Sequence, residues 1–158
     1  MLVRSYQQRV YGLARKMVID HDDADDITQE VFIKIHKAIE NFREDAQLYT
    51  WIYRIATNES LTFLSKKRRR FFLPLEDIGP ELAAKIDSTP ALSGDEIQKK
   101  LQKALLTLPD KQRLVFNLKY YEEMPYEEMS AVTGTSEGAL KASYHHAVKK
   151  IEEFLSNE

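Results

Sequence analysis

Two groups of basic and polar residues have the types and spacing that nucleic-acid binding needs. The first is a run of five basic residues, from Lys66 to Arg70. The second lies in the last third of the chain, where Lys141, His145 and Lys149 recur at steps of four residues. On a helix such residues share one face, so they could reach phosphates and base edges together. Both groups would also fit a solvated helix face, so neither decides the function alone.

The sequence offers no comparable group for catalysis or metal binding. It has no cysteine, which excludes disulfides, thiolate nucleophiles and cysteine-ligated zinc. His145 and His146 are adjacent, so on a helix they point about 100° apart and form no metal-binding pair. No glycine-rich phosphate loop, serine elbow or kinase motif is present. We expect a protein that is not an enzyme and that uses no metal and no cofactor.

Composition predicts a soluble, cytosolic and mostly helical protein. Of its 158 residues 43% are hydrophobic and 30% are charged, which is typical of a globular chain. Five glycines and five prolines are few for an all-β protein, and no apolar run is long enough for membrane insertion. The formal net charge is −2, although residues 1–70 carry 13 basic and 10 acidic side chains. Because phosphate neutralisation supplies most affinity for nucleic acid, this balance predicts weak DNA binding by the chain alone.

Hydrophobic periodicity predicts an all-α fold of two small helical domains joined by a flexible linker. Apolar residues at steps of three and four predict three helices in the first domain, over 2–19, 23–40 and 48–66. Residues 71–94 contain three of the five prolines and are acidic, which indicates a linker with one short turn of structure. Four helices are expected after it, over 95–107, 110–122, 126–133 and 136–155.

The last two helices have the pattern of a helix-turn-helix. Gly134 stands where a helix C-terminus favours the left-handed conformation, and Thr135 or Ser136 could cap the following helix. That helix would bury an apolar stripe of Leu140, Tyr144, Ala147, Ile151 and Phe154. Its opposite face presents Gly138, Lys141, Ala142, His145 and Lys149. Small residues on this face would allow close approach to a DNA groove, although similar hairpins occur in helical domains that bind no DNA.

The second helix has a polar face that suits a protein partner. Its apolar stripe comprises Ile27, Val31, Ile35, Ala38 and Ile39. Opposite the stripe lie Asp26, Gln29, Ile33 and His36. A polar face interrupted by an isoleucine is typical of a docking surface, but it also fits a solvated face with one stray apolar residue.

The third helix has side chains that suit single-stranded nucleic acid. Trp51, Asn58 and Thr62 share one edge, and Arg54, Leu61, Ser65 and Arg68 share the outer face. Bases stack on aromatic rings, amides bond base edges and basic groups hold phosphates, here beside the aperiodic loop 41–47. In the alternative interpretation Trp51 belongs to the core, and the basic run is a solvated helix end or a nuclear localisation signal.

Three segments resemble the extracytoplasmic-function (group 4) sigma factors of bacterial RNA polymerase. DDADDITQEVFIKIHKAI is similar to the D-A-E-D-L-x-Q-E-x-F motif of sigma region 2, and TWIYRIATNESLTFLSKKRRR is similar to its W-L-x-R-I-A-x-N continuation. LPDKQRLVFNLKYYEEMPYEEMSAVTGTSEGALKASYHHAVKKI is similar to region 4, with its L-P-x-x-x-R-x-V-F opening. The resemblance implies a region 2 domain over 1–70, a linker over 71–94 and a region 4 domain over 95–158.

The resemblance also implies partners and site residues for a transcription initiation factor. Docking on the β′ clamp helices of core RNA polymerase falls on Asp26, Gln29, Glu30 and Ile33. Recognition of the promoter −10 element falls on Asn41, Phe42, Arg43, Trp51, Arg54, Asn58, Thr62, Lys66, Lys67, Arg68 and Arg69. Recognition of the −35 element falls on Ser136, Glu137, Gly138, Lys141, Ala142, Ser143, His145, His146 and Lys149. An anti-sigma factor is a further expected partner.

The chain departs from the family pattern at several of these positions. Thr62 stands where the family usually has Asp, and Ser65, Ser143 and His146 stand where it usually has Arg. Without the arginine-to-guanine contact, we expect −35 recognition to depend on DNA shape, the backbone and Lys141. The chain also begins where the family usually has another half helix, so a short N-terminal piece is expected to be absent. The alternative function is a sigma-like adaptor or decoy that binds an anti-sigma factor or polymerase without reading promoters.

Overall fold

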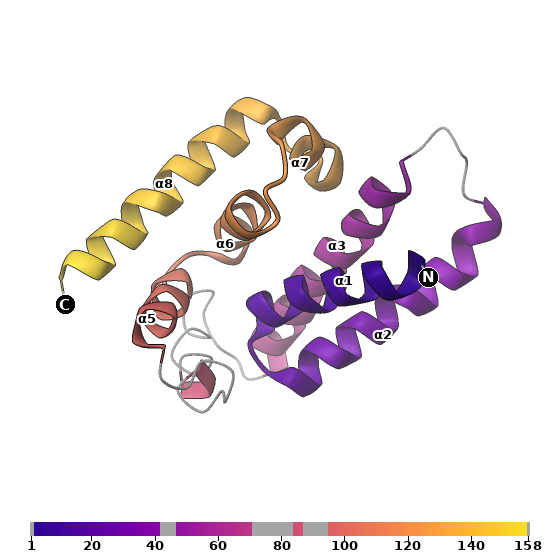
Figure 1. Ribbon diagram of the computed structural model, residues 1–158, viewed down its shortest axis with the longest axis horizontal. Helices are drawn as coiled ribbons and strands as arrows, with labels where there is room; N and C mark the ends of the chain where they lie inside the picture. Colours follow the sequence, from indigo (N-terminus) through magenta and orange to yellow (C-terminus); the bar gives the residue numbers. More distant parts are fainter. Residues whose placement is uncertain (1, 42–46, 71–83, 87–94, 158) are drawn as a thin grey trace.

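The computed structural model describes residues 2–41, 47–70, 84–86 and 95–157 (Figure 1). Within these residues every regular element is helical and no strand occurs. The first lobe comprises α1 (Leu2–Val18), α2 (His21–Ala38), the 3-10 turn η1 (Ile39–Asn41) and α3 (Leu48–Arg70). The second lobe comprises α5 (Glu96–Leu105), α6 (Asp110–Phe116), the π-helical turn η3 (Asn117–Tyr121), α7 (Tyr126–Thr133) and α8 (Glu137–Ser156). The predicted all-α fold with two helical lobes is confirmed.

The first lobe is a three-helix bundle in which α1, α2 and α3 each pack on the other two. Val10, Leu13, Val31 and Leu64 are fully buried between them. Asp20 caps α2, because its carboxylate accepts a hydrogen bond from the backbone N–H of Asp23 at 3.2 Å. The bundle therefore fixes which faces of α2 and α3 point outward.

Two boundaries in the first lobe differ from those that the periodicity predicts. The periodicity predicts that Ile39 belongs to the buried stripe of α2, but Ile39 is 49% exposed in the structure. The α-helix ends at Ala38, and the tighter 3-10 turn η1 rotates Ile39 out of the stripe. Helix α3 continues to Arg70 and not to residue 66, and basic side chains are favourable at a helix C-terminus.

The second lobe contains the predicted helix-turn-helix in α7 and α8. Gly134 ends α7 with φ of 74°, and the Ser136 side chain accepts a hydrogen bond from the Ala139 backbone N–H at 3.2 Å. In the stripe of α8, Leu140, Ala147 and Ile151 are buried. The helix expected over 110–122 instead ends at Phe116 and widens into η3.

The two lobes pack against each other along α3. Helices α6 and α7 both contact α3, and α6 also contacts α1 (Figure 1). Leu114, Met129 and Leu140 of the second lobe belong to the same buried cluster as the core of the first. Residues 84–86 are helical, and Ile86 is buried in this cluster. One hydrophobic cluster therefore continues across both lobes, and a second cluster, which includes Leu105, Phe116 and Ile151, lies within the second lobe.

Candidate functional site

The structure places the predicted docking residues of α2 together on one exposed face. Asp26, Gln29 and Glu30 are exposed, and Ile33 is 47% exposed. The Gln29 side-chain amide donates to the Asp25 carboxylate at 3.1 Å, which orders part of this face. An exposed isoleucine within a carboxylate and amide surface leaves an apolar contact available to a partner protein.

The residues predicted to bind a single strand lie in two different environments. Arg54, Asn58 and Thr62 are exposed on α3, whereas Trp51 is partly buried against the core. Asn41 ends the turn η1. Phe42 and Arg43, in the loop expected to capture a base, lie outside the described residues.

The face of α3 that the sequence presents as its outer face is turned toward the second lobe. Arg54 donates a hydrogen bond to the backbone carbonyl of Ala131 in α7 at 2.6 Å. The preceding residue, Tyr53, is buried, and its hydroxyl donates to the Glu122 carboxylate at 2.8 Å. Burial, together with the bond to Glu122, raises the pKa of Tyr53 far above its ordinary value.

The basic end of α3 is likewise divided between solvent and the interior. Lys66 and Arg69 are exposed, whereas Lys67 and Arg68 are buried. The Lys67 ammonium lies 3.7 Å from the Asp23 carboxylate, within the first lobe. Arg68 forms an ion pair with Asp110 at the start of α6, and burial lowers the pKa of Arg68.

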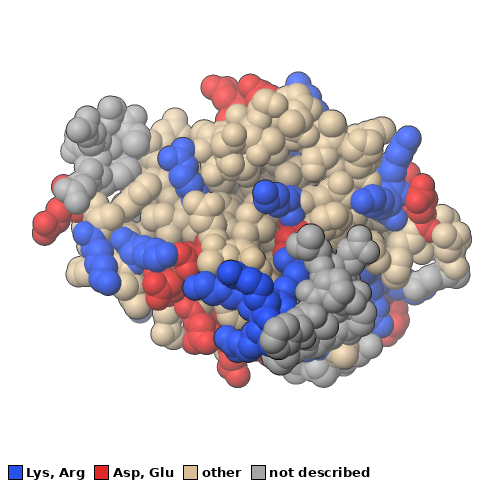
Figure 2. Space-filling model, turned by 180° about the vertical axis from the view of Figure 1, so that it is seen from behind, with Lys and Arg blue, Asp and Glu red and all other residues tan. Residues whose placement is uncertain are grey.

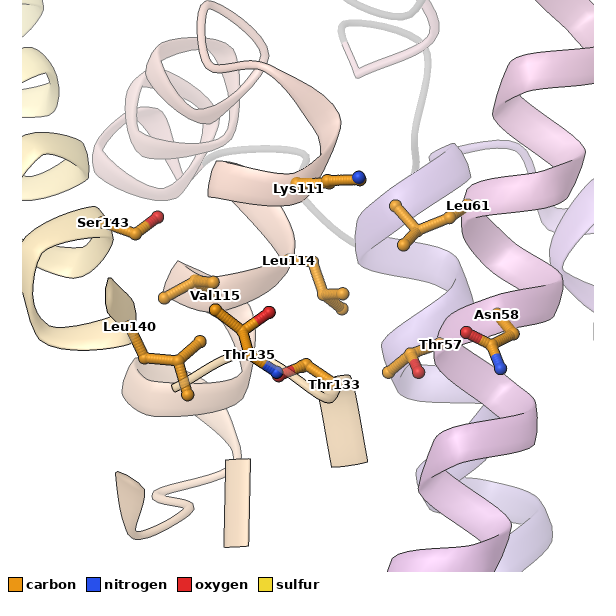
Figure 3. Close-up of a pocket in the computed structure, with 10 residues that line it drawn as sticks. All are labelled: Thr57, Asn58, Leu61, Lys111, Leu114, Val115, Thr133, Thr135, Leu140 and Ser143. Atoms are coloured by element: carbon orange, nitrogen blue, oxygen red, sulfur yellow. The ribbon is translucent and has the colours of Figure 1, made fainter. Parts of the chain in front are cut away.

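A cavity of about 230 Å³ lies between the lobes at this face (Figure 3). Asn58 and Leu61 line it from α3, and Lys111 and Leu114 line it from α6. In Figure 3 the α3 side chains face those of the second lobe across the cavity. The cavity therefore opens beside residues that the sequence assigns to the −10 strand.

The predicted recognition face of α8 is exposed along most of its length. Its exposed members are Ser136, Glu137, Gly138, Lys141, Ala142, His145, His146 and Lys149. Ser143 is partly buried and lines the interlobe cavity. The Lys141 ammonium lies 5.6 Å from the ring centroid of Tyr126 in α7, so it stays near the helix-turn-helix surface.

Sequence reasoning missed the residues that join the lobes. Arg113 of α6 is 1% exposed and donates to the Met17 backbone carbonyl at 2.9 Å. Burial lowers the pKa of Arg113 to about 10, and the nearby charge of Arg68 acts in the same direction. Asn117 donates to the Met17 sulfur at 3.4 Å. The sequence contains one signal for this role, because Arg113 stands beside the apolar residues of the segment QRLVFNL.

Basic and acidic side chains are interspersed on one face of the molecule. On the face drawn in Figure 2, Lys and Arg side chains form several groups with acidic side chains between them. No group of His, Asp or Glu within the described ranges could hold a metal ion. No helix in the described part of the chain is both long and apolar enough to cross a membrane.

Comparison with protein families decides the identity of the two lobes. Residues 2–70 match the family described as sigma-70 region 2, and residues 98–151 match the family described as sigma-70, region 4. The RNA polymerase sigma-H factor of Pseudomonas aeruginosa is 32% identical, over 98% of this chain and 84% of that protein. The ECF RNA polymerase sigma factor SigW of Bacillus subtilis is 30% identical, over 98% of this chain and 87% of that protein.

The chain belongs to the extracytoplasmic-function sigma factors of the sigma-70 family. It is a transcription initiation factor that binds core RNA polymerase and directs it to promoters. Sigma factors act in transcription initiation and are not the catalysts of RNA synthesis.

Two solved structures share the fold of this sigma factor. The sigma factor RpoE of Bartonella quintana, in complex with the anti-sigma factor NepR, gives a TM-score of 0.75 at 22% identity and covers 98% of this chain and 94% of that chain. CnrH, in complex with the cytosolic domain of CnrY, gives a TM-score of 0.71 at 24% identity and covers 99% of this chain and 86% of that chain.

Proposed function

We propose that α2 docks this sigma factor on the β′ clamp helices of core RNA polymerase. The observation that carries the proposal is the exposed face of Asp26, Gln29, Glu30 and Ile33, opposite a buried stripe. Carboxylates and an amide around one exposed isoleucine suit an interface with an apolar centre and a polar rim. The modest net charge fits this arrangement, because the polymerase then supplies much of the affinity for DNA.

In the bound state the two lobes read different promoter elements. Asn58, Thr62 and Arg54 of α3 contact the unpaired −10 strand, with Lys66 and Arg69 on its phosphates and Trp51 beside it. Their shared exposure on α3 supports this assignment for all but Trp51, which is partly buried. Helix α8 enters the −35 major groove, where Gly138 and Ala142 permit close approach.

A further proposed partner is an anti-sigma factor, and the proposed site of action is the cytoplasm. Both solved relatives of this fold were captured with such a regulator or with a cytosolic partner domain. The exposed α2 and α8 faces supply surfaces that a regulator could cover.

The docking proposal predicts the effect of replacing Asp26 and Gln29 together by Ala. We expect affinity for core polymerase to fall at least about tenfold, while the free energy of unfolding changes by under about 0.5 kcal/mol, because both residues are exposed. The measurements are polymerase binding and run-off transcription on a promoter library. Gln8→Ala with Glu153→Ala, which also removes one amide and one carboxylate from exposed helix positions, is the matched control.

The same experiment separates the two functions that the sequence left open. Promoter-dependent transcripts from the unaltered chain support a promoter-reading factor. Polymerase binding without transcripts from any promoter would instead favour the adaptor or decoy. Unchanged polymerase affinity in the double variant would contradict the docking face.

A further inference from the structure

The interlobe cavity has an apolar inner wall and a polar rim. Leu114, Val115 and Leu140 form the inner wall, and each of them is buried. At the rim Lys111 is exposed, and in Figure 3 its side chain extends from α6 toward Leu61 of α3. A cavity that is apolar inside and polar at its mouth suits a ligand with an apolar body and a polar head.

The polar groups of the cavity offer hydrogen-bond donors that the protein itself does not use. The Thr57 and Thr133 hydroxyls already donate to backbone carbonyls of their own helices, at 3.0 and 2.8 Å. Within the described ranges, by contrast, the side chains of Lys111, Asn58 and Ser143 form no hydrogen bond or ion pair. An ammonium group has three donors, an amide has two and a hydroxyl has one. The cavity therefore suits a ligand whose head accepts hydrogen bonds.

The charge of the cavity favours an anion. Of the described residues that line it, Lys111 is the one with a charge, so no carboxylate faces its ammonium there. The carboxylate of the preceding residue, Asp110, is paired with Arg68 and lies 3.7 Å from the guanidinium of Arg113. An anionic head would supply the partner that Lys111 lacks, and the apolar wall beside it would strengthen the attraction.

The size of the cavity limits the ligand further. Its volume of about 230 Å³ is below the roughly 300–1,000 Å³ of pockets that hold drug-sized molecules, which leaves room for about eight to ten non-hydrogen atoms. A phosphate group would bring up to two negative charges to a single lysine, without the arginine fork that holds phosphate best. A carboxylate on a short apolar body matches both the volume and the single cation.

We propose that the cavity between α3, α6 and α8 binds a small organic carboxylate, with its head on Lys111 and its apolar body on Leu114, Val115 and Leu140. The proposal goes beyond the proposed function, because these four residues are assigned neither to the polymerase nor to promoter DNA. A ligand at this place contacts helices of both lobes, so its binding stabilises the folded chain by mass action.

The test compares isocaproate, a branched carboxylate of this size, with isocaproamide, which has nearly the same shape and no charge. Both are titrated into the unaltered chain, and nuclear magnetic resonance of the Leu114, Val115 and Leu140 methyl groups reports binding at the cavity itself. Lys111→Gln removes the charge and keeps most of the side-chain length. Lys37→Gln, which removes an exposed lysine charge from α2, is the matched control.

We expect isocaproate to shift these methyl signals saturably, with a Kd of about 1 mM, a modest affinity for so few atoms. Isocaproamide should bind the unaltered chain at least about tenfold more weakly, and so should isocaproate with Lys111→Gln, because each pair lacks one charge. Lys37→Gln should bind isocaproate as the unaltered chain does. At about ten times its Kd, isocaproate should raise the Tm of the unaltered chain by about 4 °C and leave that of Lys111→Gln nearly unchanged.

A second variant keeps the lysine and fills the cavity. Leu61 points into the cavity from α3, so Leu61→Phe places a larger side chain where the apolar body of the ligand would lie (Figure 3). We expect this variant to lose the saturable shifts. If Leu61→Phe does not fold, the comparison of Lys111→Gln with Lys37→Gln still decides the proposal.

Each other outcome overturns the proposal. Without a saturable shift from isocaproate, or from a panel of straight, branched and aromatic carboxylates, the cavity is not a carboxylate site. Equal binding of isocaproamide, or unchanged affinity in Lys111→Gln, shows that charge does not select the ligand. The same shifts with inorganic phosphate alone indicate a general anion site. Shifts confined to methyl groups elsewhere place the ligand outside the cavity.

Discussion

Lys141 is the basic side chain of α8 whose role can be tested most directly. It is exposed, lies beside Tyr126 and has exposed small residues, Gly138 and Ala142, next to it on the same face. An ammonium group is a point charge that lacks the flat two-pronged geometry by which arginine reads guanine.

We expect Lys141→Ala to weaken DNA binding nearly evenly across −35 variants and to lower the salt slope by about one. The measurement is binding of holoenzyme to a panel of −35 variants at two salt concentrations. Lys150→Ala, which also removes one positive charge from an exposed position on α8, is the control for charge. A loss confined to one base position would show that Lys141 reads sequence directly.

Tyr121 gives a second prediction at the scale of one residue. Burial raises its pKa to about 12, and Tyr120 adds to the effect, while the hydrogen bond from the Gln102 amide at 3.1 Å opposes it. The fold therefore favours the protonated phenol over the phenolate. The raised pKa of Tyr121 contributes its full stabilisation of the fold below the ordinary pKa of 10. This stabilisation is lost as the pH rises from about 10 toward 12.

We expect the unaltered chain to lose stability relative to Tyr121→Phe over that interval. Chemical unfolding of both proteins in a pH series measures the difference, and ultraviolet absorbance of the phenolate follows the titration itself. Because the other ionisable groups are common to both chains, the comparison isolates Tyr121. Parallel stability curves above pH 10 would show that this tyrosine titrates normally.

At the scale of elements, local chemistry accounts for what the sequence predicted well. Gly134 and Ser136 define the turn of the helix-turn-helix by local effects. Gly134 adopts the left-handed backbone conformation, and the Ser136 side chain accepts a hydrogen bond from the residue three positions later. The turns η1 and η3 were missed because no local residue type specifies them. Ile39 and Asn117 continue an apparent helical pattern, yet the backbone departs from the α-helix at both places.

Gly138 allows stability and DNA binding to be separated within one element. A Cβ added there meets no atom within 4 Å, and the residue is helical. We expect Gly138→Ala to stabilise the chain by about 0.5 kcal/mol, because alanine favours helix, and to weaken −35 binding, because the methyl group holds α8 away from the groove.

Thermal unfolding and binding to −35 DNA measure the two effects separately. Gly134→Ala is the contrasting variant, since its φ of 74° is strained for alanine and should cost about 1 kcal/mol of stability. If Gly138→Ala binds −35 DNA as well as the unaltered chain, close approach of the backbone at this position is not needed.

At the scale of the whole molecule, the packing of the lobes could not be read from the sequence. Helical periodicity correctly placed Arg54, Leu61 and Arg68 on one face of α3. Nothing local indicates what covers that face, because Asp110 and Ala131 approach it from far along the chain. The assigned faces of α2 and α8 were predictable because each follows from the buried stripe of its own helix.

The shared core of the two lobes has a consequence for unfolding. Leu114, Met129 and Leu140 are buried in one cluster with the residues of α1, α2 and α3, so separating the lobes exposes apolar surface on both. We expect the unaltered chain to unfold in a single cooperative transition. Trp51, the one tryptophan of the chain, reports on α3 by fluorescence, while circular dichroism reports on all the helices.

The two signals should therefore give coincident denaturation curves for the unaltered chain and for E152Q/E153A, a control that removes two carboxylates from the exposed surface of α8. In D110N/E122A the loss of the contacts to Arg68 and Tyr53 should uncouple the lobes, so that the fluorescence curve separates from the circular dichroism curve. Curves that already differ in the unaltered chain would mean that the lobes fold independently and that their shared core does not couple them. Coincidence in all three proteins would instead place the coupling in the apolar cluster and not in the polar contacts.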